Sequence, residues 1–389
     1  MTVPLRLAYL LTATLLLAGC GWNPFSFLSG NDDVEAPAEL VDFDEEVGLR
    51  RQWNISIGNG QGDKYNRLKP AISNEVVIAA SNNGNVVAVN RENGNRLWRT
   101  RLDYEITGGV GIGGGRVFVG TENSSVIALD EDTGEVLWET QVTSEVLSAP
   151  AANNRYVVVE AIDGKLTGHD AATGEQLWIY ENTVPALTLR GTSSPLIIEN
   201  FILAAFSNGT VVSLALDNGT LRWEERVAVP TGTSEIDRMV DIDGDLFVTD
   251  NGLLLVPSYQ GYLAAIDVVT GQTRWRIQES SANGASSGFG NIYIADERGH
   301  VKAYRVGEDD LVWNNEQLDL RDLTAPSSFN NYVAVGDFEG YLHLLSQVDG
   351  RFVGRTRVDS DGIRAPIQSR GNTLYVFGNG GNLSAYTVQ

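Results

Sequence analysis

The sequence of 389 residues predicts an all-β fold, an eight-bladed β-propeller built from four-stranded antiparallel blades. Three observations lead to this prediction. Tryptophans recur at a similar interval, and each interval holds the same set of short apolar strands. The repeat region also begins and ends with an incomplete unit, and each of these two units holds the strands that the other lacks. No stretch shows the sustained apolar periodicity of an amphipathic helix.

The first element is an apolar leader. The run Leu7–Leu17 is too short to span a bilayer, which needs about 20 apolar residues, but its length is typical of a signal peptide. It ends in Leu-Ala-Gly-Cys, which resembles the lipobox of bacterial lipoproteins, where the chain is cut before the cysteine and the cysteine is acylated. We therefore expect a signal peptide over 1–19 and a lipid anchor on Cys20, the only cysteine. By the same resemblance, Gly21 favours the outer membrane, because inner-membrane lipoproteins usually carry Asp there.

An acidic segment follows the leader. Residues 31–48 hold eight carboxylates and no basic residue, so we expect 20–47 to be a flexible, solvated tether. The whole chain has a formal net charge of −22. This charge argues against a nucleic-acid partner, because phosphate contacts need clustered Lys and Arg.

The tryptophans set the period of the ring. They lie 38–52 residues apart, a spacing typical of propeller blades. Each indole can bury about 150–250 Å² between neighbouring blades, so we expect a structural role for the series. Its members are Trp53, Trp98, Trp138, Trp178, Trp223, Trp275 and Trp313.

Each unit predicts four short strands in a meander. The third and fourth strands flank a turn with Asp or Asn followed by Gly, and the fourth strand carries the tryptophan, as in SSVIALDEDTGEVLWET. A more apolar strand such as EVVIAAS or RVFVGTE precedes this pair. A shorter segment, often begun by Pro or Gly, comes first.

The two ends of the repeat predict how the ring closes. The seventh unit, 326–358, has Gly354 where a tryptophan is expected. The eighth unit, 366–389, holds only three strands, whereas Leu49–Ser56 is a tryptophan strand with no blade before it. We therefore expect Leu49–Ser56 to complete the eighth blade and to close a propeller over 48–389.

Motifs that would indicate an enzyme or a metal site fail on inspection. Asp241–Asp245 begins like an EF-hand loop, but Leu246 stands at the sixth position and Gly252 at the twelfth, where Gly and Glu are required. Gly109–Gly114 contains G-x-G-x-x-G, but it precedes a strand and not a helix. The three histidines, His169, His300 and His343, fall in three different units, with no partner at ligand spacing. We therefore expect no catalytic residue, no cofactor and no metal.

The turn motif carries a family resemblance. Thr-Gly-Glu-Val-Leu-Trp over Thr133–Trp138 and Thr-Gly-Glu-Gln-Leu-Trp over Thr173–Trp178 resemble the repeat of the pyrroloquinoline-quinone-type propellers, across nearly all of 49–389. One branch of that family holds quinoprotein dehydrogenases, which are far longer and carry a vicinal cysteine pair that is absent here. The other holds the outer-membrane lipoprotein of the β-barrel assembly machinery. A lipobox, a short acidic segment and one bare propeller resemble the second branch.

Two long connectors predict a docking site. The segments 178–201 and 223–253 take 23 and 30 residues from a tryptophan to the second strand of the next unit, against 18 for 138–156. The segment 53–76 also takes 23, so length alone does not single them out. Because 178–201 and 223–253 are consecutive in the ring, we expect them to emerge side by side on one face.

The resemblance implies what these connectors bind. In the lipoprotein branch the matching segments dock on a periplasmic POTRA domain of BamA, the barrel-inserting subunit. An apolar segment with an arginine beside a pair of carboxylates fits a protein interface. The partner-binding residues implied by the resemblance are Leu187, Leu189, Arg190, Asp241 and Asp243.

Structural roles for these residues stay open at this stage. Leu187 and Leu189 alternate with a threonine, as inner-strand residues do, and Asp241 and Asp243 are also good turn formers. The acids could instead position Arg190.

Two other functions remain alternatives to the scaffold: a quinoprotein-like dehydrogenase, or a propeller with another envelope partner. Unfolded outer-membrane proteins could also pair directly with exposed outer strands.

Overall fold

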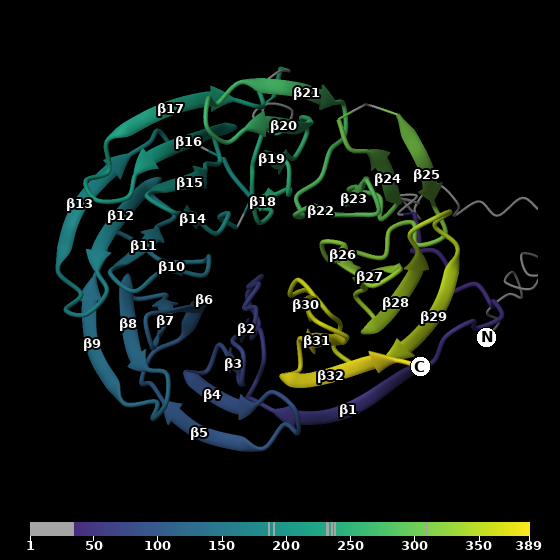
Figure 1. Ribbon diagram of the computed structural model, residues 1–389, viewed down its shortest axis with the longest axis horizontal. Coiled ribbons are helices and arrows are strands. Elements are labelled where there is room, and N and C mark those ends of the chain that lie inside the picture. Colours follow the sequence, from purple (N-terminus) through teal and green to yellow (C-terminus); the bar gives the residue numbers. More distant parts are fainter. Residues whose placement is uncertain are drawn as a thin grey trace, which may run out of the picture. The chain divides into compact units, whose positions relative to one another are not determined.

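The computed structural model describes residues 35–389, except 186, 190, 231, 232, 235, 237, 238, 308 and 309. The expected signal peptide and Cys20 lie outside these residues. Pro37–Gln389 forms one compact unit, in which the described residues contain 32 strands in eight four-stranded sheets arranged as a ring (Figure 1). The predicted all-β, eight-bladed propeller is thereby confirmed. The described part of the chain holds no helix long and apolar enough to cross a membrane.

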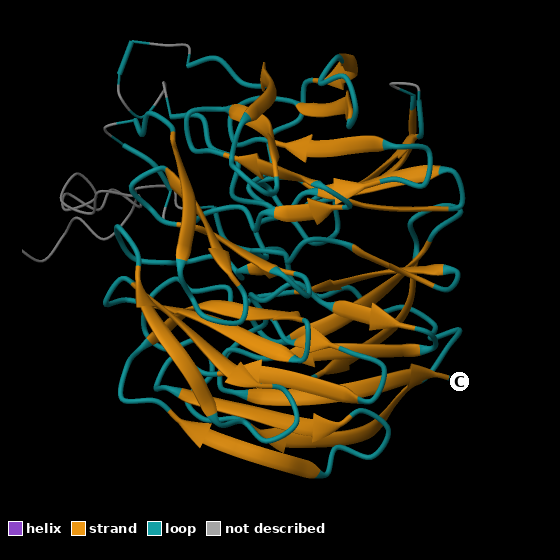
Figure 2. Ribbon diagram, turned by 60° about the vertical axis from the view of Figure 1, so that its left-hand side comes forward, coloured by secondary structure: helices purple, strands orange, loops and turns teal. Residues whose placement is uncertain are grey.

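Every blade is an antiparallel meander whose strands run in order from the centre of the ring to its rim (Figure 1). Loops and turns join these strands (Figure 2). Apolar residues alternate between the two faces of each sheet, and buried residues from adjacent sheets form the core between blades. Blades 1 to 4 consist of β2 (Ala71–Ile72), β3 (Val76–Ala80), β4 (Asn85–Asn90) and β5 (Arg96–Arg101); β6 (Ile106–Gly113), β7 (Arg116–Thr121), β8 (Ser125–Asp130) and β9 (Val136–Gln141); β10 (Ala151–Ala152), β11 (Tyr156–Glu160), β12 (Lys165–Asp170) and β13 (Gln176–Glu181); and β14 (Leu196–Ile198), β15 (Phe201–Ala205), β16 (Thr210–Ala215) and β17 (Leu221–Arg226).

The second half of the ring repeats the same meander. Blades 5 to 8 consist of β18 (Phe247–Val248), β19 (Leu253–Pro257), β20 (Leu263–Asp267) and β21 (Thr273–Ile277); β22 (Ser286–Gly288), β23 (Asn291–Ala295), β24 (Val301–Arg305) and β25 (Leu311–Asn315); β26 (Ser327–Phe329), β27 (Tyr332–Gly336), β28 (Tyr341–Ser346) and β29 (Phe352–Arg357); and β30 (Gln368–Arg370), β31 (Thr373–Phe377), β32 (Asn382–Val388) and β1 (Leu49–Ser56).

Strand β1 closes the ring, as the sequence predicted. It pairs antiparallel with β32 from Leu49 opposite Val388 to Ser56 opposite Asn382. Gly48 and Gln389 extend the pairing, because each backbone N–H donates to the other's carbonyl, at 3.2 and 3.0 Å. The two ends of the propeller therefore belong to one sheet (Figure 1).

The tryptophans bind neighbouring blades together, as expected. Trp98 on β5 is 8% exposed, and its Nε1 donates to the carbonyl of Glu131 in the next blade at 2.8 Å. The turn glycine of that blade, Gly134, lies against the same indole with φ of +72°, and a Cβ there would come within 2.5 Å of the ring. The same position therefore needs glycine for its conformation and for the space that the indole takes.

The last part of the acidic segment differs from the expected tether. Residues 38–47, called the strap here, lie against blades 6 and 7. Ala38 N donates to Asp319 O at 2.9 Å and Val47 N to Val353 O at 3.1 Å. A Cβ on Gly354 would lie 2.9 Å from the carbonyl oxygen of Val47, so the strap occupies the place where the other blades put a tryptophan. The expectation of a solvated tether through residue 47 was therefore wrong for this stretch.

Candidate functional site

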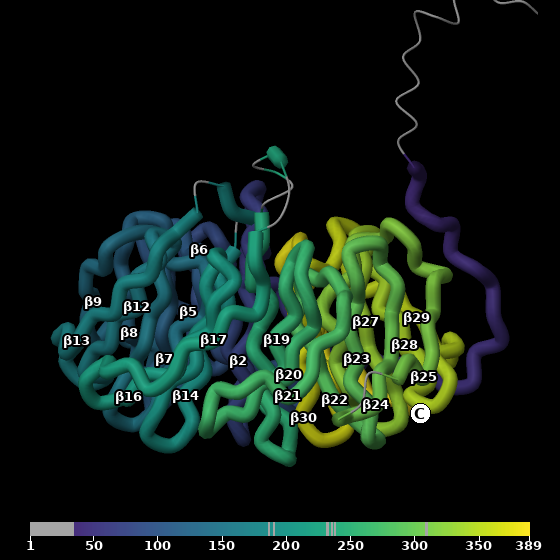
Figure 3. The backbone as a smooth tube through the Cα atoms, turned by 90° about the horizontal axis from the view of Figure 1, so that it is seen from above, coloured from purple at the N-terminus to yellow at the C-terminus, as the bar shows by residue number. Residues whose placement is uncertain are grey.

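The long connectors lie on one face of the ring. In an antiparallel meander, the link from the outermost strand to the next blade and the turn between the second and third strands lie at the same end of the sheet. This end is called the connector face. It carries the first connector, residues 182–195 between β13 and β14, and the second connector, residues 227–246 between β17 and β18. Described parts of the second connector rise above the ring in Figure 3.

Asp241 joins the two connectors. Its Oδ2 accepts a hydrogen bond from the backbone N–H of Leu189 at 2.8 Å, and its Oδ1 accepts one from Ile242 N at 2.9 Å. Its backbone carbonyl accepts from Tyr259 N at 2.8 Å. One side chain thus fixes the first connector on the second, and the backbone of the same residue fixes the second connector on blade 5.

The residues that the resemblance implied divide into surface and buried positions. Leu187 is 41% exposed and Leu189 is half-buried, and neither lies in a strand. Asp241 and Asp243 are only 1% and 6% exposed. Arg190 lies outside the described residues.

A carboxyl cluster lies beneath the connectors. Burial, and then the charge of Asp243, raises the pKa of Asp241 to about 8. Burial also raises the pKa of Asp243, although Arg67 opposes this shift, and it raises the pKa of the buried Glu160 well above its usual value. Glu160 and Arg67 had no recognisable signal in the sequence, except that a glutamate ends the otherwise apolar strand β11.

A second polar contact ties both connectors to blade 1. Lys69, just before β2, forms an ion pair with Asp245 of the second connector, and its Nζ lies 3.1 Å from Ser194 Oγ of the first. Burial alone would raise the pKa of Asp245, but the charge of Lys69 keeps this pKa below its usual value. Among the described residues, no group of three or more His, Cys, Asp or Glu side chains is arranged to hold a metal ion.

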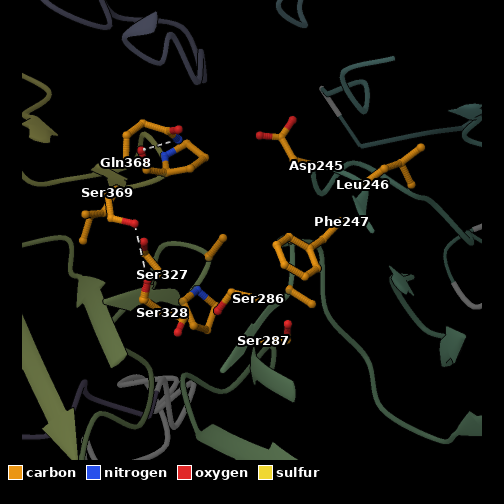
Figure 4. Close-up of a pocket in the computed structure, with 15 residues that line it drawn as sticks. Asp245, Leu246, Phe247, Ser286, Ser287, Ser327, Ser328, Gln368 and Ser369 are labelled. Carbon is orange, nitrogen blue, oxygen red and sulfur yellow. Dashed lines mark hydrogen bonds between the residues drawn. The ribbon is translucent and has the colours of Figure 1, made fainter. Parts of the chain in front are cut away.

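A cavity of about 310 Å³ lies where the innermost strands of blades 5 to 8 converge (Figure 4). Five serine side chains line it, together with larger ones such as Phe247 and Gln368. Phe247 and Asp245 lie on one side of the cavity in Figure 4, and Gln368 and Ser369 on the other. Ser369 Oγ donates to the carbonyl of Ser328 at 3.3 Å, which links blades 8 and 7.

Comparison with known proteins bears on what this ring does. The family model described as outer membrane protein assembly factor BamB matches residues 82–315. The chain belongs to the BamB family. Curated relatives that carry this name include the protein of Pseudomonas aeruginosa, 57% identical over 98% of both chains, and that of Escherichia coli K12, 34% identical over 94% of both. The names of these relatives agree with the resemblance to the lipoprotein branch, which implied a protein of the outer-membrane assembly machinery.

Solved structures agree with this assignment. The crystal structure of BamB from Moraxella catarrhalis matches with a TM-score of 0.81 at 28% identity, over 87% of this chain and 99% of that one. The quinohemoprotein alcohol dehydrogenase of Comamonas testosteroni matches with a TM-score of 0.71 at 14% identity, over 87% of this chain and 76% of that one. At this identity, the second match shows a shared fold only.

Proposed function

We propose that this BamB-family chain is a non-enzymatic scaffold lipoprotein of the outer-membrane β-barrel assembly machinery. Its connector face binds a POTRA domain of BamA, and this contact aids the folding and insertion of outer-membrane β-barrels. A lipid on Cys20 holds the ring at the periplasmic face of the outer membrane. The proposed anchor rests on the lipobox-like sequence, which lies outside the described residues.

One observation carries the choice of docking site. Asp241 accepts the hydrogen bond of Leu189 N, so the two connectors form one surface instead of two independent loops. Leu187, two residues earlier, remains 41% exposed on that surface. A preorganised surface with an exposed apolar side chain favours binding, because little conformational freedom is lost when the partner docks. Asp241 supports this surface from below, so we assign it a positioning role.

Binding of purified POTRA domains of BamA to the purified ring tests the proposal. We expect Leu187→Asp to raise the Kd by about tenfold or more, because it places a charge in an apolar contact, and Arg190→Ala to cost about 2 kcal/mol of binding. Leu137→Asp is the matched control, because Leu137 is 46% exposed but lies on the outermost strand β9. If the Leu187 and Leu137 variants bind equally well, the docking site lies elsewhere on the ring.

The fold shared with quinoprotein dehydrogenases favours one alternative, an enzyme. Incubation of the ring with pyrroloquinoline quinone and Ca²⁺ tests it directly. We expect the protein fraction from gel filtration to show no quinone absorbance, because the quinone remains free. A quinone spectrum that travels with the protein would support the enzyme and contradict the scaffold as the sole function.

A further inference from the structure

A second cavity on the connector face, of about 540 Å³, lies beside the proposed docking residues. Leu189 forms part of its wall, so a protein bound on the connectors would also cover this opening. The wall comes from connectors and turns of several blades, and its size is in the range of cavities that bind ligands. The lining residues are Tyr65, Arg67, Leu189, Asp243, Tyr259, Ala282, Asn283, Asp296, Glu297, Asp322 and Leu323.

The wall of this cavity has an excess of negative charge. Of its four acids, Asp296 forms an ion pair with Lys302, with 3.0 Å between Asp296 Oδ2 and Lys302 Nζ, and Lys302 also pairs with Glu279. The other three acids face one cation, Arg67. Glu297 and Asp322 are exposed at the rim, and Asp243 is buried at the wall.

One carboxylate oxygen of Asp243 lacks a hydrogen-bond donor. The residue is 6% exposed, and its Oδ1 has no hydrogen-bond partner among the described residues. A buried acceptor without a donor destabilises the folded ring, because nothing replaces its lost hydrogen bond to water. Arg67 does not meet this need, because its Nη1 donates to the carbonyl of Ala282 at 2.9 Å and its guanidinium lies over the ring of Tyr65.

We propose that this cavity receives a basic side chain, an arginine or a lysine, from the protein that docks on the connectors. The charged group would donate to Asp243 Oδ1, with Glu297 and Asp322 around it. The ring of Tyr259 in the wall suits a cation, and a guanidinium in particular, whereas Arg67 and Arg364 of this chain already lie over the ring of Tyr65. This inference rests on the proposed function and adds the chemistry by which the partner is recognised.

Docking is then linked to proton release. The charged groups around Asp243 are Glu160, Asp241 and Arg67, and Lys69, Asp245 and Arg364 share a small neighbouring pocket with it. Glu160 and Asp241 have raised pKa values, that of Asp241 being about 8. At neutral pH the cluster therefore holds protons. A cation beside Asp243 favours the ionised carboxylates, so binding expels protons and the Kd should fall as the pH rises from about 6 to about 8.

Calorimetric titration of the full ring with the POTRA domains of BamA, in two buffers with different ionisation enthalpies, measures both effects. We expect Glu297→Gln with Asp322→Asn to raise the Kd by about threefold to tenfold at low salt and to reduce its salt dependence. We expect Asp243→Asn to weaken binding by about tenfold and to decrease the number of protons released. The exposed acids Glu92 and Asp132, on turns at the opposite end of the blades, supply the control pair Glu92→Gln with Asp132→Asn.

The outcomes separate this inference from the proposed function. If the unaltered ring does not bind the POTRA domains, the proposed function fails. If it binds, but the rim variant has the Kd and salt dependence of the control pair, no basic side chain enters the cavity and the inference is overturned. Binding that releases no protons at neutral pH would also overturn it. Because the rim residues are exposed, their variant remains informative even if Asp243→Asn does not fold.

Discussion

Asp241 shows how one buried carboxyl group organises a surface without belonging to it. Both of its side-chain oxygens accept backbone hydrogen bonds, from Leu189 and from Ile242. The residue is 1% exposed, so a docking protein would contact the connectors that Asp241 holds together and not its carboxylate. Substitutions at Asp241 should therefore affect binding through the conformation of the connectors.

The raised pKa of Asp241 predicts a pH-dependent stability. In the unfolded chain the carboxyl titrates near its usual value of 3.8, and in the folded ring near 8. Between these values the folded state binds more protons, so the free energy of unfolding decreases as the pH rises. We expect Asp241→Asn to reduce this decrease, as measured by denaturant unfolding at about pH 5 and about pH 8. Asp243 and Glu160 titrate in the same direction, so part of the slope remains. Identical slopes for the variant and the unaltered chain would contradict the assignment.

Single residues also mark the limit of what the sequence predicted. Trp98 and its partner Gly134 were predictable, because the same pair recurs from blade to blade and each copy supports the others. The cavity and the carboxyl cluster were not, because Arg67, Asp243 and Glu160 are far apart in the sequence and meet only once the ring has formed. The burial of Asp243 was equally hidden, since an acid in a long connector is normally exposed.

The strap is an element that composition concealed. Its acids Asp42 and Asp44 are exposed, whereas Leu40, Val41 and Phe43 pack against the core of blades 6 and 7. The average composition of the strap indicates a solvated segment, because half of its residues are carboxylates and none is basic. The alternation between them was the available signal.

The contacts of the strap continue into the interior of blade 7. Arg355 donates from Nη1 to the carbonyl of Val41 at 2.9 Å and from Nε to Nδ1 of His343 at 3.0 Å. The Nε2 of His343 lies 3.0 Å from Asp337 Oδ2. His343 is fully buried, and burial lowers its pKa, so the neutral ring accepts the hydrogen bond of Arg355. This histidine has a structural role in positioning the strap.

Removal of the strap should destabilise the ring. We expect a chain that begins at residue 48 to lose about 2–4 kcal/mol of unfolding free energy, relative to one that begins at residue 36, because several half-buried apolar side chains are exposed. Phe43→Ala should reproduce part of this loss, since its ring lies 5.5 Å from that of Phe352, between ring centres. Asp44→Ala, at an exposed neighbour, is the control. Equal melting temperatures for the chains beginning at 36 and at 48 would show that the strap contributes nothing.

At the scale of the whole molecule, stability depends on closure of the ring. The strands of each blade pack against those of the neighbouring blades, and polar contacts such as the ion pair between Lys69 and Asp245 also join segments of blades further apart. The eight sheets therefore form a chain of interfaces that is complete only when blade 8 is complete. Blade 8 is assembled from both ends of the propeller, because β1 supplies its outermost strand and β30 to β32 supply the other three. The sequence predicted this closure because an unmatched strand and an incomplete unit can be counted without any knowledge of side-chain contacts.

Removal of β1 should therefore cost far more than removal of the strap. A chain that begins at residue 59 lacks the pairing from Leu49 to Ser56, the buried Ile57, and Trp53, whose indole is 8% exposed and donates to the carbonyl of Arg91 at 3.0 Å in blade 1. Loss of the indole alone should cost about 3–5 kcal/mol, and loss of the strand also leaves the outer edge of β32 unpaired. We expect the total to exceed about 5 kcal/mol, which is comparable with the whole stability of many proteins, so this chain should aggregate or melt without a cooperative transition. Circular dichroism melts of chains beginning at residues 48 and 59, with Trp53→Ala in the longer chain as an intermediate case, measure the effect. If the two chains melt at the same temperature, β1 does not close the ring and the stability of each blade is local.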